Sequence, residues 1–255
     1  MQKAVEICSR SLTLRGMLHI PENITGKIPV VMIFHGFTGN KMEPHFIFVK
    51  LSRLLEKKGV ASVRFDFGGS GESDGDFVDM TLSKELEDAK AILKFVKTLD
   101  FVDQDRIAAV GLSMGGVVAS MLASDHKADI KTLCLWAPAG NMKEIRPKGK
   151  SEAEVQEVYR TGFIDIGGLA LGVDFINDLN SLDLYAKASA YDKKVLLLHG
   201  NKDETVPLSA SRQYQEIYGN RAELHIIEGG DHTFDQLKQE NEVLNLTVGF
   251  LEENL

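Results

Sequence analysis

The chain has 255 residues, of which 44% are hydrophobic and 26% charged, proportions that exclude a disordered or fibrous protein. This length fits one large α/β domain or two smaller ones, and it is sufficient to bury a sizeable core. The formal net charge of −8 argues against binding to nucleic acid or to anionic membranes, since a diffuse acidic surface attracts neither.

The sequence shows neither a membrane segment nor a secretion signal. No apolar run approaches the roughly 20 residues that a membrane span needs. Residues 1–10 carry charges within their apolar part, unlike a signal peptide, so we expect a cytoplasmic protein.

Cys8 and Cys134 form neither a disulfide framework nor a metal-ligand spacing, so we expect two buried free thiols and no metal site.

Apolar patterning predicts strands that alternate with helices. Residues 4–20 alternate loosely and predict a hairpin at a sheet edge. Residues 28–34 are continuously apolar and stop at a His-Gly pair, as expected of a strand that is covered on both faces. A helix of about four turns at 45–58, closed by Gly59, should follow.

The same alternation continues along the chain and predicts an α/β protein. The expected elements are strand 60–65, loop 66–79, helix 82–99, strand 107–110, helix 114–124, strand 132–136, strand 195–198, helix 209–218, strand 224–227 and helix 234–253. Helical crossovers of this length imply a mostly parallel sheet, of about eight strands with one antiparallel strand near the N-terminus. Residues 139–181 break the rhythm and predict a cap inserted in a single domain of residues 1–255.

Ser113 lies in the motif Gly111-Leu-Ser-Met-Gly115, between the predicted strand 107–110 and helix 114–124. A strand, a sharp turn and a helix are the setting of a nucleophile elbow, which exposes the serine hydroxyl at the carboxyl edge of the sheet. Glycines leave room for the strained serine backbone. The motif alone is as often a structural turn, and a dinucleotide-binding loop is disfavoured because Ser113 replaces its middle glycine.

A serine nucleophile needs a histidine as base and a carboxylate that orients it, in the chain order Ser, Asp or Glu, His. Of seven histidines, His232 alone follows the last predicted strand. The other six are more simply explained by packing or by backbone hydrogen bonds. The turn after strand 195–198 supplies Asp203 and Glu204; we favour Asp203 because it comes earlier in the turn, and Glu204 stays open. Asp231 is interpreted as a turn residue.

An oxyanion formed at Ser113 requires backbone N–H donors. The fold provides them from the residue after the nucleophile and from the loop after an early strand. These are Met114 and Phe37, the latter between Gly36 and Gly39, which let the loop curl tightly.

With these residues in place, the chain resembles the α/β-hydrolase superfamily and, within it, bacterial cinnamoyl (feruloyl) esterases. The likeness covers most of residues 28–250 and is closest at 35–40, 61–67, 73–75, 117–123 and 228–232. The resemblance implies a catalytic triad of Ser113, Asp203 and His232, oxyanion amides at Phe37 and Met114, and no cofactor.

One departure lies at the nucleophile. The esterases usually place His before and Gln after the serine, where this chain has Leu112 and Met114. The Met114 backbone amide survives the change, but a role of the Gln side chain does not carry over. No substrate contact is carried over for residues 140–175.

The combined prediction is a serine esterase that acts on small or aromatic acyl esters. Its expected partner is a small-molecule ester, and a homodimer is compatible with the sequence. One rival is a peptidase of the same fold, in which cap carboxylates at Glu152, Glu154, Asp165 and Asp174 would anchor a peptide terminus. A second is an acylglycerol lipase with a lipid-facing stretch at 163–175. A third is a binding protein without turnover, which need not keep a triad.

Overall fold

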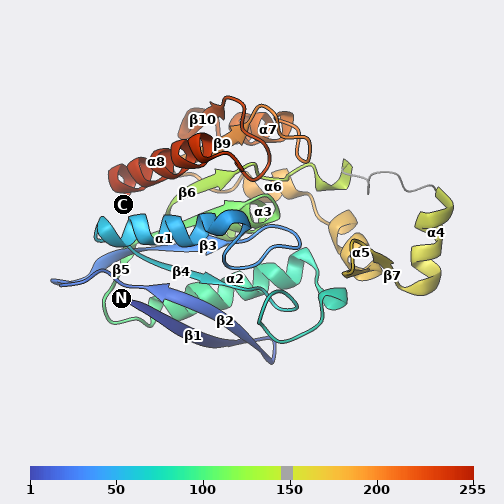
Figure 1. The fold of residues 1–255 in the computed structure, drawn as a ribbon, viewed down its shortest axis with the longest axis horizontal. Helices are drawn as coiled ribbons and strands as arrows, with labels where there is room; N and C mark the ends of the chain where they lie inside the picture. The colour runs from blue at the N-terminus through green and yellow to red at the C-terminus, as the bar shows by residue number, and fades with distance from the viewer. Residues whose placement is uncertain (145–151) are drawn as a thin grey trace.

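The computed structural model describes residues 1–144 and 152–255, and its centre is a twisted sheet with helices on both faces (Figure 1). The eight strands follow the order β1-β2-β4-β3-β5-β6-β9-β10. Their bounds are β1 Gln2–Ser9, β2 Leu12–His19, β3 Ile28–Phe34, β4 Ala61–Phe65, β5 Val102–Leu112, β6 Ile130–Trp136, β9 Val195–Gly200 and β10 Ala222–Ile227.

The sheet is mostly parallel, which confirms the predicted fold class. β2 is antiparallel to both of its neighbours, β1 and β4, whereas every other pair is parallel. The β1–β2 hairpin therefore contributes the single reversed strand near the N-terminus. Because parallel strands share one direction, the loops that follow β3, β4, β5, β6, β9 and β10 meet at the same edge.

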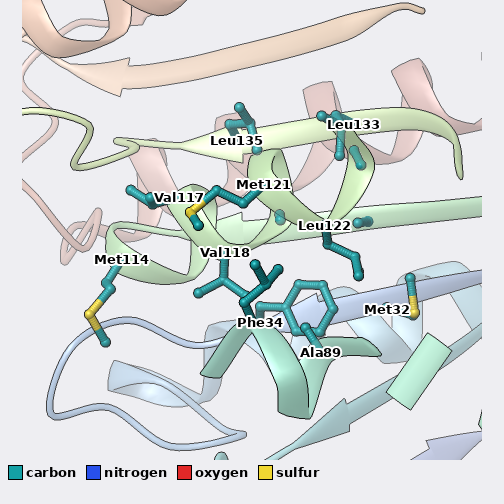
Figure 2. Close-up of a cluster of buried hydrophobic side chains, with 14 of the residues drawn as sticks. Met32, Phe34, Ala89, Met114, Val117, Val118, Met121, Leu122, Leu133 and Leu135 are labelled. Carbon is teal, nitrogen blue, oxygen red and sulfur yellow. The ribbon is translucent and has the colours of Figure 1, made fainter. Parts of the chain in front are cut away.

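Helices cover both faces, which explains the unbroken apolar strands. In β3, Val30, Met32 and Phe34 face one core, and Val31 and Ile33 face the other. The first core contains α2 Leu82–Lys97, α3 Met114–Asp125, α6 Leu184–Ala188 and α7 Ser209–Tyr218, and the second contains α1 Ile47–Lys57 and α8 Leu237–Asn254. Figure 2 shows Phe34 of β3 among side chains of α2 and α3.

Two helices begin later than predicted, because residues before them have left-handed backbones. α1 begins at Ile47, after His45 (φ 43°) and Phe46 (φ 61°). α8 begins at Leu237, since the buried Phe234 has a φ of 58°. Non-glycine residues adopt such angles only where other contacts hold them, and the apolar pattern does not record those contacts.

The expectation of two buried thiols is half wrong. Cys134 is buried in β6, whereas Cys8 is exposed. β1 is an edge strand, and most of its side chains are accessible to solvent. Both cysteines are free.

Most of the predicted cap is described, although residues 145–151 lie outside the described part. It contains η3 Met142–Glu144, α4 Glu152–Thr161, the short antiparallel pair β7 Phe163–Asp165 and β8 Ala170–Gly172, and α5 Val173–Ser181. α4 and β7 project at one side of the molecule (Figure 1). β8 packs against η2 Phe77–Asp79, in the loop after β4. Among the described helices, none is long and apolar enough to cross a membrane.

The junction of β5 and α3 leaves no room for a side chain at Gly111. A Cβ atom there would overlap the carbonyl group of Gly115, which is backbone and cannot move aside.

We expect Gly111→Ala to lower the free energy of unfolding by at least about 2 kcal/mol. Gly249→Ala in α8 is the matched control: nothing lies within 4 Å of the added methyl group. It should raise stability by about 0.5–1 kcal/mol, as alanine does in a helix. Urea unfolding measures both, and equal stability of the two variants would contradict this account.

Candidate active site

Ser113 forms a strained turn between β5 and α3. Its φ of 57° and ψ of −119° lie outside the regions that side-chain-bearing residues prefer. The turn is held by backbone hydrogen bonds: Ser113 N–H donates to Trp136 O at 2.8 Å, and Ser113 O accepts from Gly116 N at 3.1 Å and Ala139 N at 3.2 Å. The serine is partly exposed, at the N-terminus of a twelve-residue helix whose dipole favours negative charge.

Asp203 and His232 meet at the same edge, from the loops after β9 and β10. His232 Nδ1 lies 2.7 Å from Asp203 Oδ2. Since a carboxylate only accepts, Nδ1 carries the proton, and Nε2 of the neutral ring is left as the basic nitrogen. The structure thus brings together the predicted acid and base. Glu204 is exposed, and Asp231 accepts from Asp235 N within its own turn.

Four donors hold the Asp203 carboxylate. Oδ1 accepts from the Thr205 and Val206 amides, both at 2.8 Å, and Oδ2 faces His232 and, at 3.3 Å, His199 Nε2. Burial disfavours the charge, but the hydrogen bonds from the two histidines and the backbone outweigh it, so the pKa of Asp203 lies well below its usual value. Asp203 is therefore ionised at neutral pH.

Sequence analysis did not single out His199, the last histidine before the Asp203 turn. Its Nε2 donates to Val206 O at 2.9 Å as well as toward Asp203, and its Nδ1 accepts from Ser211 Oγ at 2.7 Å. The ring is fully buried. His199 thus fixes the Asp203 turn to α7, and the available signal was its place four residues before the acid, at the end of a strand.

The loop after β3 forms a tight turn beside the nucleophile. Gly39 N–H donates to Gly36 O at 3.0 Å, and Thr38 has a φ of 61°. A Cβ atom on Gly36 would lie 3.2 Å from Ser113 Cβ, so the turn abuts the elbow. Within the described part of the chain, neither the Phe37 N–H nor the Met114 N–H donates a hydrogen bond. Both predicted oxyanion amides are therefore available beside Ser113.

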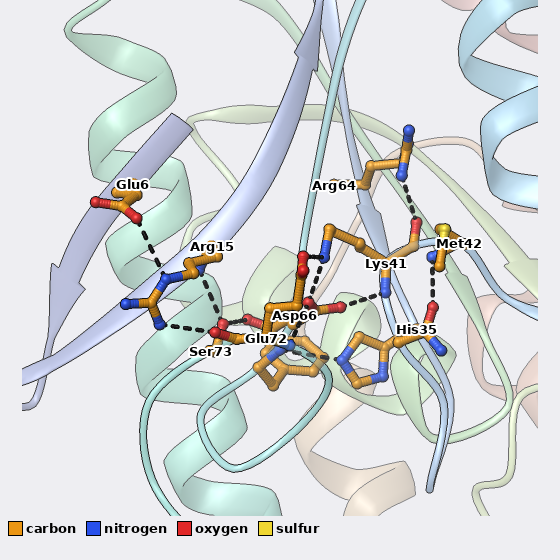
Figure 3. Close-up of polar contacts among 11 residues, drawn as sticks. Glu6, Arg15, His35, Lys41, Met42, Arg64, Asp66, Glu72 and Ser73 are labelled. Carbon is orange, nitrogen blue, oxygen red and sulfur yellow. Dashed lines mark hydrogen bonds and ion pairs between the residues drawn. The ribbon is translucent and has the colours of Figure 1, made fainter. Parts of the chain in front are cut away.

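Asp66, in the loop after β4, anchors the loop after β3 (Figure 3). Its buried carboxylate accepts from Lys41 N and Lys41 Nζ, each at 2.6 Å, and from Glu72 N at 3.0 Å. The Asp66 carbonyl accepts from Ser73 Oγ at 2.7 Å, and Ser73 Oγ in turn accepts from Arg15 N. The loops after β3 and β4 are thereby joined to β2.

Aromatic rings gather where the cap meets this loop. The Phe37 ring centroid lies 5.5 Å from that of Phe175 in α5 and 5.8 Å from that of Phe77 in η2. Phe175 is buried, whereas Phe37 and Phe77 are partly exposed. Since Phe37 also carries the predicted oxyanion amide, the cap places apolar aromatic surface close to the predicted nucleophile.

The cap carboxylates do not converge in the described residues. Asp165 in β7 and Asp174 in α5 are exposed, and the side chains of Glu152 and Glu154 lie outside the described part of the structure. Among the described residues, no group of three or more His, Cys, Asp or Glu is placed to hold a metal ion.

Residues 47–255 match the prolyl oligopeptidase family. The chain belongs to this family.

The structure is similar to that of Est1E from Butyrivibrio proteoclasticus, solved with ferulic acid bound. The two share a TM-score of 0.88 and 30% sequence identity, and the match covers 98% of this chain and 99% of that one. Mouse mitochondrial palmitoyl-protein thioesterase ABHD10 is 26% identical over 225 residues, 83% of this chain and 71% of that protein. An uncharacterised 31.7 kDa Escherichia coli protein from the traX-finO intergenic region is 31% identical over 104 residues, 40% of this chain and 35% of that protein.

These relatives and the fold identify the chain as a serine hydrolase of the α/β-hydrolase fold. The matches comprise a peptidase family, a palmitoyl-protein thioesterase and a protein that binds ferulic acid, so family membership alone does not define the substrate. Leu112 and Met114, the two positions that depart from the cinnamoyl esterase pattern, are both buried.

The two carboxylates of the 203–204 turn differ sharply in their contacts, which makes them a natural pair for mutation. We expect Asp203→Asn to lower kcat about 10⁴-fold, as loss of the aspartate does in a protease triad, because the amide cannot hold His232 in the required tautomer. Glu204→Gln, at an exposed neighbour, should leave kcat within about twofold. Steady-state kinetics on a p-nitrophenyl ester measures both, and a larger loss in Glu204→Gln would assign the orienting role to Glu204.

Proposed function

We propose that this chain is a carboxylic ester hydrolase that acts through an acyl-enzyme on small or aromatic acyl esters, with Ser113 as nucleophile, His232 as base and Asp203 as the orienting acid. The observation that carries the proposal is the 2.7 Å contact of His232 with Asp203 at the same sheet edge as the strained Ser113 elbow and the turn that bears Phe37 N–H.

In the first half of the proposed reaction, Ser113 Oγ attacks the ester carbonyl while His232 Nε2 takes its proton. The Asp203 carboxylate stabilises the imidazolium that forms. The amides of Phe37 and Met114 donate to the oxyanion of the tetrahedral intermediate, which then collapses as His232 protonates the leaving alcohol. In the second half, His232 activates water, which releases the acid and regenerates Ser113.

Two observations support a flat, compact acyl group. Phe37, Phe77 and Phe175 bring aromatic surface next to the proposed oxyanion amide. Aromatic rings favour offset or tilted contacts with other rings, which suits an acyl group such as a hydroxycinnamoyl. The similar Est1E structure holds ferulic acid, at 30% identity over nearly the whole chain.

Two other acyl classes compete with this one. The family match favours a peptide, and the similarity to ABHD10 favours a long-chain acyl thioester. All three reactions pass through an acyl-enzyme on the serine, so they differ in how the acyl and leaving groups are bound. The comparison that separates them is therefore relative kcat/KM.

We expect methyl ferulate and p-nitrophenyl butyrate to be hydrolysed with higher kcat/KM than p-nitrophenyl palmitate, palmitoyl-coenzyme A or an aminoacyl p-nitroanilide. Ser113→Ala should lower turnover of the best substrate about 10⁶-fold. A preference for palmitate or its thioester would favour the lipase or thioesterase, and a preference for the anilide would favour the peptidase. Butyrate hydrolysis without ferulate hydrolysis would retain the esterase and reject the cinnamoyl specificity.

The cap aromatic Phe175 should discriminate among acyl groups. We expect Phe175→Leu, which keeps apolar bulk but removes the ring, to lower kcat/KM for methyl ferulate about tenfold relative to p-nitrophenyl butyrate. Phe163→Leu is the matched control, because Phe163 lies in the same cap but is exposed. If Phe175→Leu leaves the ferulate-to-butyrate ratio unchanged, Phe175 does not contribute to acyl selection.

A further inference from the structure

Glu43 is a buried carboxyl group that the proposed reaction does not use. It lies in the loop between β3 and α1, with a φ of 59°, and only 8% of the residue is exposed. Its Oε1 accepts a hydrogen bond from Gly36 N at 2.5 Å. A carboxyl group is seldom buried without a role, because removing its charge from water is costly.

The Glu43 carboxyl group occupies the concave side of the turn at residues 36–39. A Cβ atom on Gly39 would lie 2.5 Å from Glu43 Oε1, and one on Gly36 would lie 3.5 Å from the same atom. Only glycine at Gly39 lets the carboxyl group come this close. Glu43 and the turn therefore pack as one unit against the elbow, where Gly36 neighbours Ser113.

The contacts of this unit determine the direction of the Phe37 N–H. Gly36 C=O and Phe37 N–H belong to one planar trans peptide, so they point in opposite directions. The Gly36 oxygen faces two donors: Gly39 N at 3.0 Å, and His35 Nδ1 at 2.9 Å, since His35 Nε2 accepts from Phe67 N. Glu43 holds the preceding amide, Gly36 N–H. Together these contacts leave the Phe37 N–H a single orientation.

Residues 43–46, where Glu43, His45 and Phe46 have positive φ, also contact the loop that carries His232. His45 Nε2 lies 3.0 Å from Thr233 O, one residue beyond His232, and His45 Nδ1 lies 2.9 Å from Glu240 Oε1 of α8. Burial raises the pKa of Glu43 to about 7, against the opposing effects of the Gly36 amide, His232 and His45. Those two histidines are the ionisable side chains whose charge would act on the carboxyl group, so Glu43 lies within electrostatic reach of the proposed base.

We propose that Glu43 is a positioning residue: its carboxyl group accepts the Gly36 N–H and so holds the 36–39 turn with Phe37 N–H directed at the oxyanion formed on Ser113. The role of Phe37 in this inference rests on the proposed function. Glu43 does not touch the substrate and transfers no proton.

Two substitutions at Glu43 distinguish the loss of the hydrogen bond from Gly36 N–H from a general loss of protein stability. Glu43→Gln keeps an acceptor for Gly36 N–H, whereas Glu43→Ala removes it. Glu85→Gln and Glu85→Ala are matched controls, because Glu85 is also buried, has a pKa raised by burial, and lies in α2 among residues that the reaction does not use. Thermal unfolding of all four variants reports their stability.

The primary measurement is the second-order rate constant for labelling of Ser113 by a fluorophosphonate, whose transition state also develops an oxyanion. We expect Glu43→Ala to lower this constant about 100-fold, as loss of one oxyanion donor does, and Glu43→Gln to lower it less than tenfold. On p-nitrophenyl butyrate the same loss should appear in kcat, with KM within about threefold. The Glu85 variants should lose stability and keep both rates within about twofold.

The proposal is overturned if Glu43→Ala labels Ser113 within threefold of the wild-type rate, or if Glu43→Gln loses as much rate as Glu43→Ala. It is also overturned if the loss in Glu43→Ala matches that in Glu85→Ala at equal loss of stability. Failure of the wild type to hydrolyse any ester would reject the proposed function alone, because the labelling rates still decide the role of Glu43.

Discussion

The close approach of three backbone segments at one sheet edge is the constraint on which the candidate site depends. The end of β5, the first turn of α3 and the loop after β3 pack so tightly that Gly111 and Gly115 admit no side chain. Ser113 adopts a strained backbone conformation at this point, held by hydrogen bonds to Trp136, Gly116 and Ala139. The strain persists because parallel strands and their helices fix the surrounding backbone, and it leaves the partly exposed Ser113 beside the Phe37 and Met114 amides, which donate no hydrogen bond among the described residues.

The buried carboxylates around this edge show how the number of donors decides the protonation state. Asp203 faces four donors, two of them histidine nitrogens, and its pKa lies below the usual value in spite of burial. Glu43 accepts one backbone N–H, burial dominates, and its pKa rises to about 7. The lowered pKa keeps Asp203 charged beside His232, as the proposed reaction requires, whereas the proposed role of Glu43 depends only on the hydrogen bond that it accepts.

The residues proposed to perform the chemistry and those proposed to select the acyl group come from different regions of the chain. The elbow, the Asp203 and His232 loops and the 36–39 turn all follow strands of the sheet. In the proposed function, acyl selection depends on the cap, whose Phe175 ring centroid lies 5.5 Å from that of Phe37. Because one fold hosts many functions, the sheet and the loops at its strand ends do not by themselves define the acyl group.

The sequence by itself determined the α/β class, the continuous apolar strands, the elbow motif around Ser113 and the chain order of serine, acid and histidine. The apolar strands and the elbow motif are local signals, since each depends on residue type and spacing within about twenty residues, and the α/β class and the chain order depend only on the succession of such signals along the sequence. Only the tertiary structure placed the Asp203 carboxylate, and not that of Glu204, against His232, because the direction of a turn depends on contacts such as that of His199 with Val206. For the same reason it alone revealed the kink at 43–46, the burial of Glu43 and the exposure of Cys8: each results from what distant segments place beside a residue.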